Sequence, residues 1–168
     1  MEAGAVGMST GLEYHPGSHA SPQEIGLLAE AVFEQGGVYA THLRDRGLHF
    51  AAAVREALAV TRQTGIRLQL SHVAPRPYAP RAETEAAFAQ IDAARGDGAP
   101  VFVDTFPETW GPGTLIDLFP AGVSDGSPDE VLARLRRPKV RQEVERYFGT
   151  QENFLLRVAG AAEIYIAS

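Results

Sequence analysis

Short apolar runs alternate with amphipathic stretches along the chain, and this alternation predicts repeated strand–helix units around a parallel sheet. Helices are expected where apolar side chains recur every three to four residues, and strands where short runs rich in β-branched and aromatic residues follow a turn signal. The expected strands lie at 3–8, 38–42, 66–70, 101–104 and 163–167. The expected helices are one that begins at Pro22, one that ends at Gly65, one over 83–95, and two short helices after Ser127 that are separated at Pro138.

The first helix has the clearest boundaries. Ser21 is placed to cap its N-terminus, Pro22 suits the first helical position, and Glu24 completes a capping box. Gly36 and Gly37 are expected to end it, because glycine adopts the left-handed conformation after a helix at no steric cost.

The length of the chain limits the architecture. A closed (β/α)₈ barrel usually needs about 250 residues, and this chain has 168. His42, His72 and Asp104 each end a predicted strand and recur at the spacing of one strand–helix unit, so the chain holds roughly four to five units. The expected fold class is therefore α/β, with one domain over residues 1–168 that is either an open doubly wound sheet or a slice of a (β/α)₈ TIM barrel.

Composition excludes several functions. The chain has 21 Asp and Glu residues against 15 Lys and Arg, so a basic surface for nucleic acid is not expected. It has no cysteine, which excludes disulfides, thiolate zinc sites and a cysteine nucleophile within these residues. No apolar run approaches 18 residues, so no membrane partner is expected either. We expect a cytoplasmic protein.

The strand ends carry the first candidate chemistry. In parallel α/β folds, active groups lie where strands end and loops begin. Side chains of His42, His72 and Asp104 could therefore meet at one rim, and imidazole and carboxylate groups are ligands for zinc and related divalent metals. The alternative is that both histidines are partly buried and only hydrogen-bonded to the loop backbone.

Two other segments contain residue types found in active sites. The segment 7–11 reads G-x-S-x-G, the nucleophile motif of serine hydrolases, but that motif needs a helix directly after Ser9, and the next helix is expected at Pro22. His15 and His19 lie in one loop. They are either candidate metal ligands or ordinary solvent-exposed loop residues, and the sequence favours the metal no more than the second interpretation. Ser124-Asp125-Gly126 reads as a turn and helix cap.

Several motifs together resemble those of the N-acyl-D-amino-acid deacylases, a branch of the amidohydrolase superfamily of metal-dependent hydrolases. The similarity runs over nearly the whole chain, and the combination of motifs is specific although no single one is. The segments that carry it are Gly4–Leu12 with Tyr14, Tyr39–Arg44, Ser71-His72, Val103–Pro107, Asn153–Leu156 and Ile164–Ser168.

The resemblance implies a (β/α)₈ barrel beside a small β-sandwich, and a zinc-dependent hydrolysis of the amide bond of N-acyl-D-amino acids or related N-acyl compounds. His42 and His72 match the family's metal ligands at the ends of the fifth and sixth barrel strands, where a cysteine from an earlier strand joins them. Asp104 matches a position that is not a ligand. Arg44 lies two residues beyond a candidate ligand and is a candidate contact to substrate or a residue that orders a loop, with a plain salt bridge as the alternative.

The chain also departs from the family pattern. The first-strand His-x-His, the metal-bridging residue and the catalytic aspartate of the eighth strand are absent from these 168 residues. Phe106, Glu108 and Trp110 stand among the positions expected to bind substrate, with Pro112 in place of a small serine-containing turn. Phe106 and Pro112 replace the tyrosine and serine that help to bind the substrate carboxylate in relatives.

We therefore expect an internal piece of a zinc-dependent amidohydrolase that is inactive alone. Two alternatives stay open at this point. The chain could be a non-catalytic remnant or assembly module that self-associates through uncovered strands, or a serine hydrolase that uses Ser9.

Overall fold

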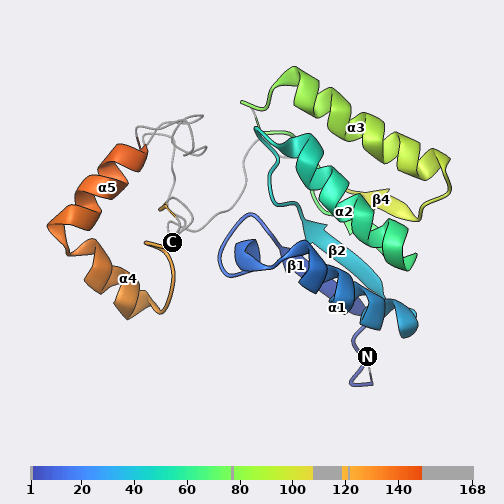
Figure 1. Ribbon diagram of the computed structural model, residues 1–168, viewed down its shortest axis with the longest axis horizontal. Helices are drawn as coiled ribbons and strands as arrows, with labels where there is room; N and C mark the ends of the chain where they lie inside the picture. Colours follow the sequence, from blue (N-terminus) through green and yellow to red (C-terminus); the bar gives the residue numbers. More distant parts are fainter. Residues whose placement is uncertain (1, 77, 108–118, 121, 149–168) are drawn as a thin grey trace. The chain divides into compact units, whose positions relative to one another are not determined.

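The computed structural model describes residues 2–76, 78–107, 119–120 and 122–148. The chain divides into two compact units, Met1–Pro107 and Glu108–Ser168 (Figure 1). We expected one partial barrel domain over residues 1–168, and the sheet with its covering helices lies entirely in the first unit. The two units are therefore described separately.

The first unit is built on a four-stranded parallel sheet. Its strands are β1 (Gly7–Gly11), β2 (Val38–His42), β3 (Arg67–Leu70) and β4 (Val101–Val103), and they pair in chain order. A doubly wound sheet reverses its strand order at a switch point, whereas a barrel adds each strand beside the previous one. The observed order supports a slice of a barrel.

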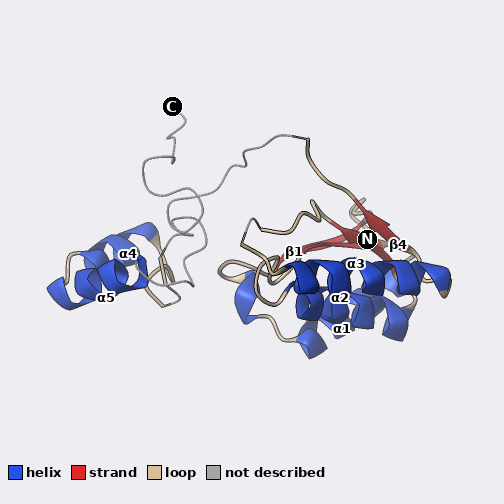
Figure 2. Ribbon diagram, turned by 90° about the horizontal axis from the view of Figure 1, so that it is seen from above, coloured by secondary structure: helices blue, strands red, loops and turns tan. Residues whose placement is uncertain are grey.

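Three helices cover one face of this sheet: α1 (Pro22–Glu34), α2 (Phe50–Thr64) and α3 (Arg81–Gly96), as Figure 2 shows. Their boundaries agree with the sequence signals. The Ser21 side chain accepts a hydrogen bond from the Glu24 N–H and caps α1. Gly65 ends α2 in the left-handed conformation, with φ of 77°.

Alternation along the strands divides the sheet into a helix-covered face and an open face. Tyr39 and Thr41 of β2 are buried, as are Leu68 and Leu70 of β3, and they pack into the core under the helices. Because successive strand residues point to opposite faces, His42 belongs to the other face, with its side chain only partly buried.

The first strand begins four residues later than the sequence predicts. The expected strand was 3–8, but Gly4 has a φ of 91°, which places a turn there, and residues 7–11 pair with Val38–His42. A Cβ on Gly7 would lie 2.2 Å from the Val38 carbonyl oxygen, so glycine permits this close pairing.

The position of β1 excludes the serine hydrolase hypothesis. Ser9 is the middle residue of the strand and pairs with Ala40. A nucleophile elbow needs a sharp turn from strand to helix at the serine, and the chain instead continues through Thr10 to the strand's last residue, Gly11.

In the second unit the described helices are α4 (Pro128–Leu135) and α5 (Pro138–Phe148). Ser127 and Glu130 form a reciprocal capping box at the start of α4, as the sequence signature predicts. The strand expected at 163–167 lies outside the described residues. None of the helices in the described ranges is long and apolar enough to cross a membrane.

Candidate metal centre

His42 and His72 meet at the carboxyl ends of two adjacent parallel strands. His42 is the last residue of β2, and His72 follows β3 by two residues. The Ser71 N–H donates to the Thr41 carbonyl, which continues the pairing of the two strands up to the histidines. As a result, His42 Nδ1 lies 3.1 Å from His72 Nε2, and the two rings meet edge to face.

The two facing nitrogens fit a zinc ion. Two nitrogen ligands at about 2.0–2.1 Å from one tetrahedral zinc lie about 3.3 Å from each other, close to the observed 3.1 Å. In the absence of a metal the same distance allows one imidazole N–H to donate to the other ring. Both the geometry and the ligand chemistry are thus compatible with a shared ion.

Glu13 occupies the other side of His42. Its Oε2 lies 2.5 Å from His42 Nε2 and 2.7 Å from the Arg76 guanidinium. Burial raises the pKa of Glu13, but the hydrogen bond from His42 and the charge of Arg76 outweigh burial, so its pKa lies below the ordinary value. Glu13 is therefore an ionised, mostly buried carboxylate bonded to a candidate ligand.

Sequence reasoning missed Glu13. The available signal was its position: it comes two residues after β1, on the same rim where His42 and His72 follow β2 and β3. A carboxylate beside histidines is the usual partner that orients a metal-binding imidazole.

His72 is held through its backbone. Its N–H donates to Asp104 Oδ1 at 2.6 Å, and its carbonyl accepts from the Arg46 guanidinium at 2.8 Å. Its φ of 40° is in the left-handed region, which is strained for histidine, and these two bonds keep it there. Asp104 Oδ2 also accepts from Gln69 at 2.6 Å, so both of its oxygens are used in holding the loop.

Burial and the positive charge of Arg46 lower the pKa of His72. The neutral imidazole is the form that binds a metal. The environment of His72 therefore favours the ligand form at neutral pH.

The predicted substrate-binding residues fall in different places. Arg44 donates three hydrogen bonds to Glu56 and one each to the carbonyls of Ser18 and Ala20, which is the loop-ordering arrangement. The Phe106 ring is 6.3 Å from the His72 ring, centroid to centroid, and is partly exposed. Glu108, Trp110 and Pro112 lie outside the described residues.

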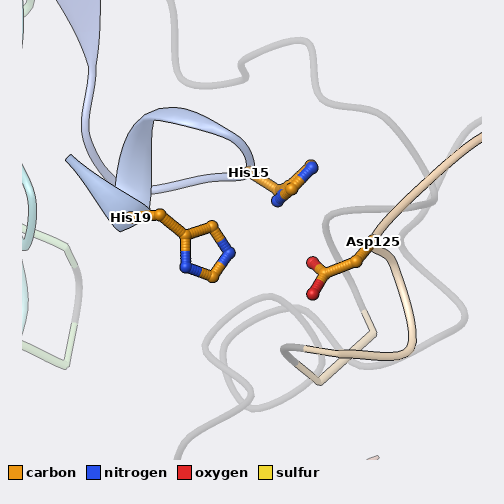
Figure 3. Close-up of side chains that lie close together, drawn as sticks. All are labelled: His15, His19 and Asp125. Carbon is orange, nitrogen blue, oxygen red and sulfur yellow. The ribbon is translucent and has the colours of Figure 1, made fainter.

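His15 and His19 form a separate pair in the loop around the short 3₁₀ helix Gly17–His19 (Figure 3). Their ring centroids are 5.2 Å apart, edge to face. Asp125, also drawn in Figure 3, belongs to the second unit.

Curated relatives with similar sequences are deacylases of N-acyl-D-amino acids. The N-acyl-D-glutamate deacylase of Alcaligenes xylosoxydans xylosoxydans is 41% identical over 120 residues, which cover 71% of this chain and 24% of the relative. The D-aminoacylase of the same organism is 39% identical over 72 residues, 43% of this chain and 15% of the relative. No family model matches the chain.

Solved structures with a fold similar to that of this chain are also deacylases. The N-acyl-D-glutamate deacylase of Bordetella bronchiseptica, complexed with zinc and a phosphonate that mimics the tetrahedral intermediate, superposes with a TM-score of 0.60 at 39% identity, over 64% of this chain and 23% of that one. A D-aminoacylase that defines a subset of amidohydrolases superposes with a TM-score of 0.59 at 34% identity, over 64% and 22%. By sequence and by fold, the chain is similar to one part of the N-acyl-D-amino-acid deacylases of the amidohydrolase superfamily, and it spans about a quarter of the length of the relatives that it matches.

Proposed function

We propose that this chain is the part of a zinc-dependent N-acyl-D-amino-acid deacylase that supplies two ligands of the metal, His42 and His72. The observation that carries the proposal is the 3.1 Å separation of His42 Nδ1 and His72 Nε2 at the ends of adjacent parallel strands. A homologous deacylase with the same local fold was solved with zinc.

Zinc, when bound, supplies a Lewis acid that polarises an amide carbonyl and lowers the pKa of a water molecule. The reaction would be the hydrolysis of the amide bond of an N-acyl-D-amino acid into a carboxylic acid and an amine. In this chain, His42 and His72 bind the metal as neutral imidazoles. The backbone bonds from Asp104 and Arg46 hold His72 in place.

The substrate would lie on the open rim beside His72. Phe106 is partly exposed there, and its ring meets the His72 ring edge to face. We propose that Phe106, Glu108 and Trp110 contact the substrate. We also propose a cytoplasmic location, in keeping with the lack of cysteine.

Zinc binding by the purified 168-residue chain tests the metal site. We expect a zinc Kd, measured by competition with a chromophoric chelator, that weakens at least about tenfold in H42A and in H72A, because each variant removes one of the two ligands. H49A is the matched control, because His49 is an exposed histidine at the start of α2. An H42A/H72A double variant that binds zinc as tightly as the wild type would overturn the assignment.

A second candidate function is a non-catalytic assembly module. In the described part of the first unit, β1 and β4 are the two outer strands of the sheet, and Phe102 of β4 is 52% exposed. Open sheet edges template pairing with other chains. Two measurements separate the two functions: light scattering after size exclusion gives the oligomeric state, and the zinc Kd of the histidine variants gives their role in metal binding. A defined oligomer whose zinc affinity does not depend on His42 and His72 favours the module.

A further inference from the structure

The Glu13 carboxylate connects the candidate metal ligands to two arginines. Its Oε2 contacts His42 Nε2 at 2.5 Å, the Arg76 guanidinium at 2.7 Å and the Arg46 guanidinium at 3.8 Å. We propose that Glu13 is a positioning residue, which fixes the proton of His42 on Nε2 and so presents an unprotonated Nδ1 to the metal. The metal part of this inference rests on the proposed function.

The hydrogen bonds determine where the proton of His42 lies. An ionised carboxylate only accepts hydrogen bonds, so His42 Nε2 must carry the proton that it shares with Glu13. In the neutral ring, Nδ1 then has a lone pair and no proton. That nitrogen is the one that faces His72, and it is where a metal held by both rings would bind.

Glu13 can hold His42 because it is itself held. Arg76 donates to the same oxygen, and Arg46 is nearly fully buried beside it. Arg46 also donates to the His72 carbonyl. The Glu13 carboxylate and the Arg46 guanidinium therefore link the side chain of one candidate ligand to the backbone of the other.

A matched carboxylate exists elsewhere in the same unit. Glu56 accepts from Arg44 at 2.8 Å, and its side chain is 18% exposed against 16% for Glu13. Both are mostly buried glutamates paired with arginine, but Glu56 is bonded to no histidine in the described hydrogen bonds. A change at Glu56 thus reproduces the loss of a glutamate–arginine ion pair without the contact to His42.

The first test is the position of the His42 proton, read from ¹⁵N side-chain chemical shifts of the metal-free 168-residue chain. We expect the wild type to have the proton on Nε2. E13A should shift His42 toward a mixture of both tautomers, and E13Q should retain most of the Nε2–H form, because the amide oxygen still accepts. E56A should leave the spectrum of His42 unchanged. A wild-type spectrum in E13A and E13Q alike would overturn the proposal.

The second test is zinc affinity. Loss of a partner that orients a metal-binding histidine weakens binding by about 10- to 100-fold, so E13A should weaken the zinc Kd in that range, E13Q less, and E56A not at all. Equal Kd values for E13A and E56A would overturn the role in metal binding. A failure of the proposed function is distinguishable, because zinc binding would then be insensitive to H42A while the tautomer of His42 still responds to E13A.

Discussion

The buried guanidinium of Arg46 donates a hydrogen bond of 2.8 Å to the backbone carbonyl of His72, which is the residue with a φ of 40°. A side chain from the loop after β2 thus fixes the backbone conformation of the loop after β3. Because His72 adopts a conformation that is unfavourable for residues with a Cβ, the position of its ring depends on this bond and on the one to Asp104.

Replacement of Arg46 should therefore destabilise the first unit. R46A removes the donor to His72 and one of the two cations near Glu13. Loss of one partner from a buried ionic pair costs about 3 kcal/mol, and we expect a decrease of that order in the free energy of unfolding, measured by urea denaturation. R46K should recover only part of the lost free energy of unfolding, since a lysine ammonium cannot reproduce the planar guanidinium of arginine. A stability of R46A within error of the wild type would contradict this account.

Arg44 should contribute to stability and not to metal binding. Its guanidinium is bonded to Glu56 and to two loop carbonyls. A double-mutant cycle of R44A and E56A should give a coupling free energy of about 1 kcal/mol, at the upper end for partly exposed pairs, because the contact is bidentate. The zinc Kd of R44A should equal that of the wild type. A coupling near zero, or a weaker zinc Kd, would instead favour a role of Arg44 in the site.

Tyr39 should make the stability sensitive to alkaline pH. Its ring is buried and its hydroxyl lies 2.9 Å from Thr10 Oγ1. Burial raises the pKa of Tyr39 above the ordinary value of about 10. The folded state therefore binds the Tyr39 proton more tightly than the unfolded state does. The resulting contribution to the free energy of unfolding is complete below pH of about 10 and is lost as the pH rises through the pKa of Tyr39 in the folded state.

The variant Y39F isolates this effect. It removes a net contribution of about 1 kcal/mol from the hydroxyl at neutral pH, and its stability should decrease less than that of the wild type between pH of about 9 and 11. Parallel pH curves for the two proteins would show that Tyr39 does not titrate as its burial requires.

Most of the fold of the first unit could be predicted from the sequence, because its signals are local. Ser21 caps α1 and Gly65 ends α2 through contacts within a few residues. The start of the first strand was predicted four residues too early. Its limits depend on pairing with β2 and on the turn at Gly4, rather than on its own apolar run.

The site was only partly predictable. His42 and His72 could be placed together because parallel strands bring their carboxyl ends to one edge. Glu13 and Arg76 are 63 residues apart in sequence, and Arg46 reaches back from the loop after β2. Their contacts depend on how three separate loops fold over one rim, and no spacing in the sequence encodes that.

The capping box of α4 gives a prediction for the second unit. Glu130 accepts from the N–H and hydroxyl of Ser127, and these hydrogen bonds lower the pKa of its carboxyl group. S127A should destabilise α4 by about 1 kcal/mol, visible as faster hydrogen exchange of amides in 131–135. Since the pKa of Glu130 is lowered in the folded state, its contribution is present at neutral pH and is lost as the pH falls through the folded pKa. Exchange rates in S127A equal to those of the wild type would contradict a capping role.

The 168-residue chain should bind zinc without hydrolysing N-acyl-D-amino acids. A catalytic zinc usually has three protein ligands, and this chain offers His42 and His72 but contains neither a cysteine nor a His-x-His pair. With N-acetyl-D-glutamate and saturating zinc, we expect no amine release above the rate of buffer containing zinc, measured with an amine-reactive dye. H42A serves as the control, since turnover by the wild-type chain that disappears in H42A would mean that two histidines of this chain suffice for the reaction. Turnover that persists in H42A would indicate a contaminating hydrolase and would leave the two-ligand argument intact.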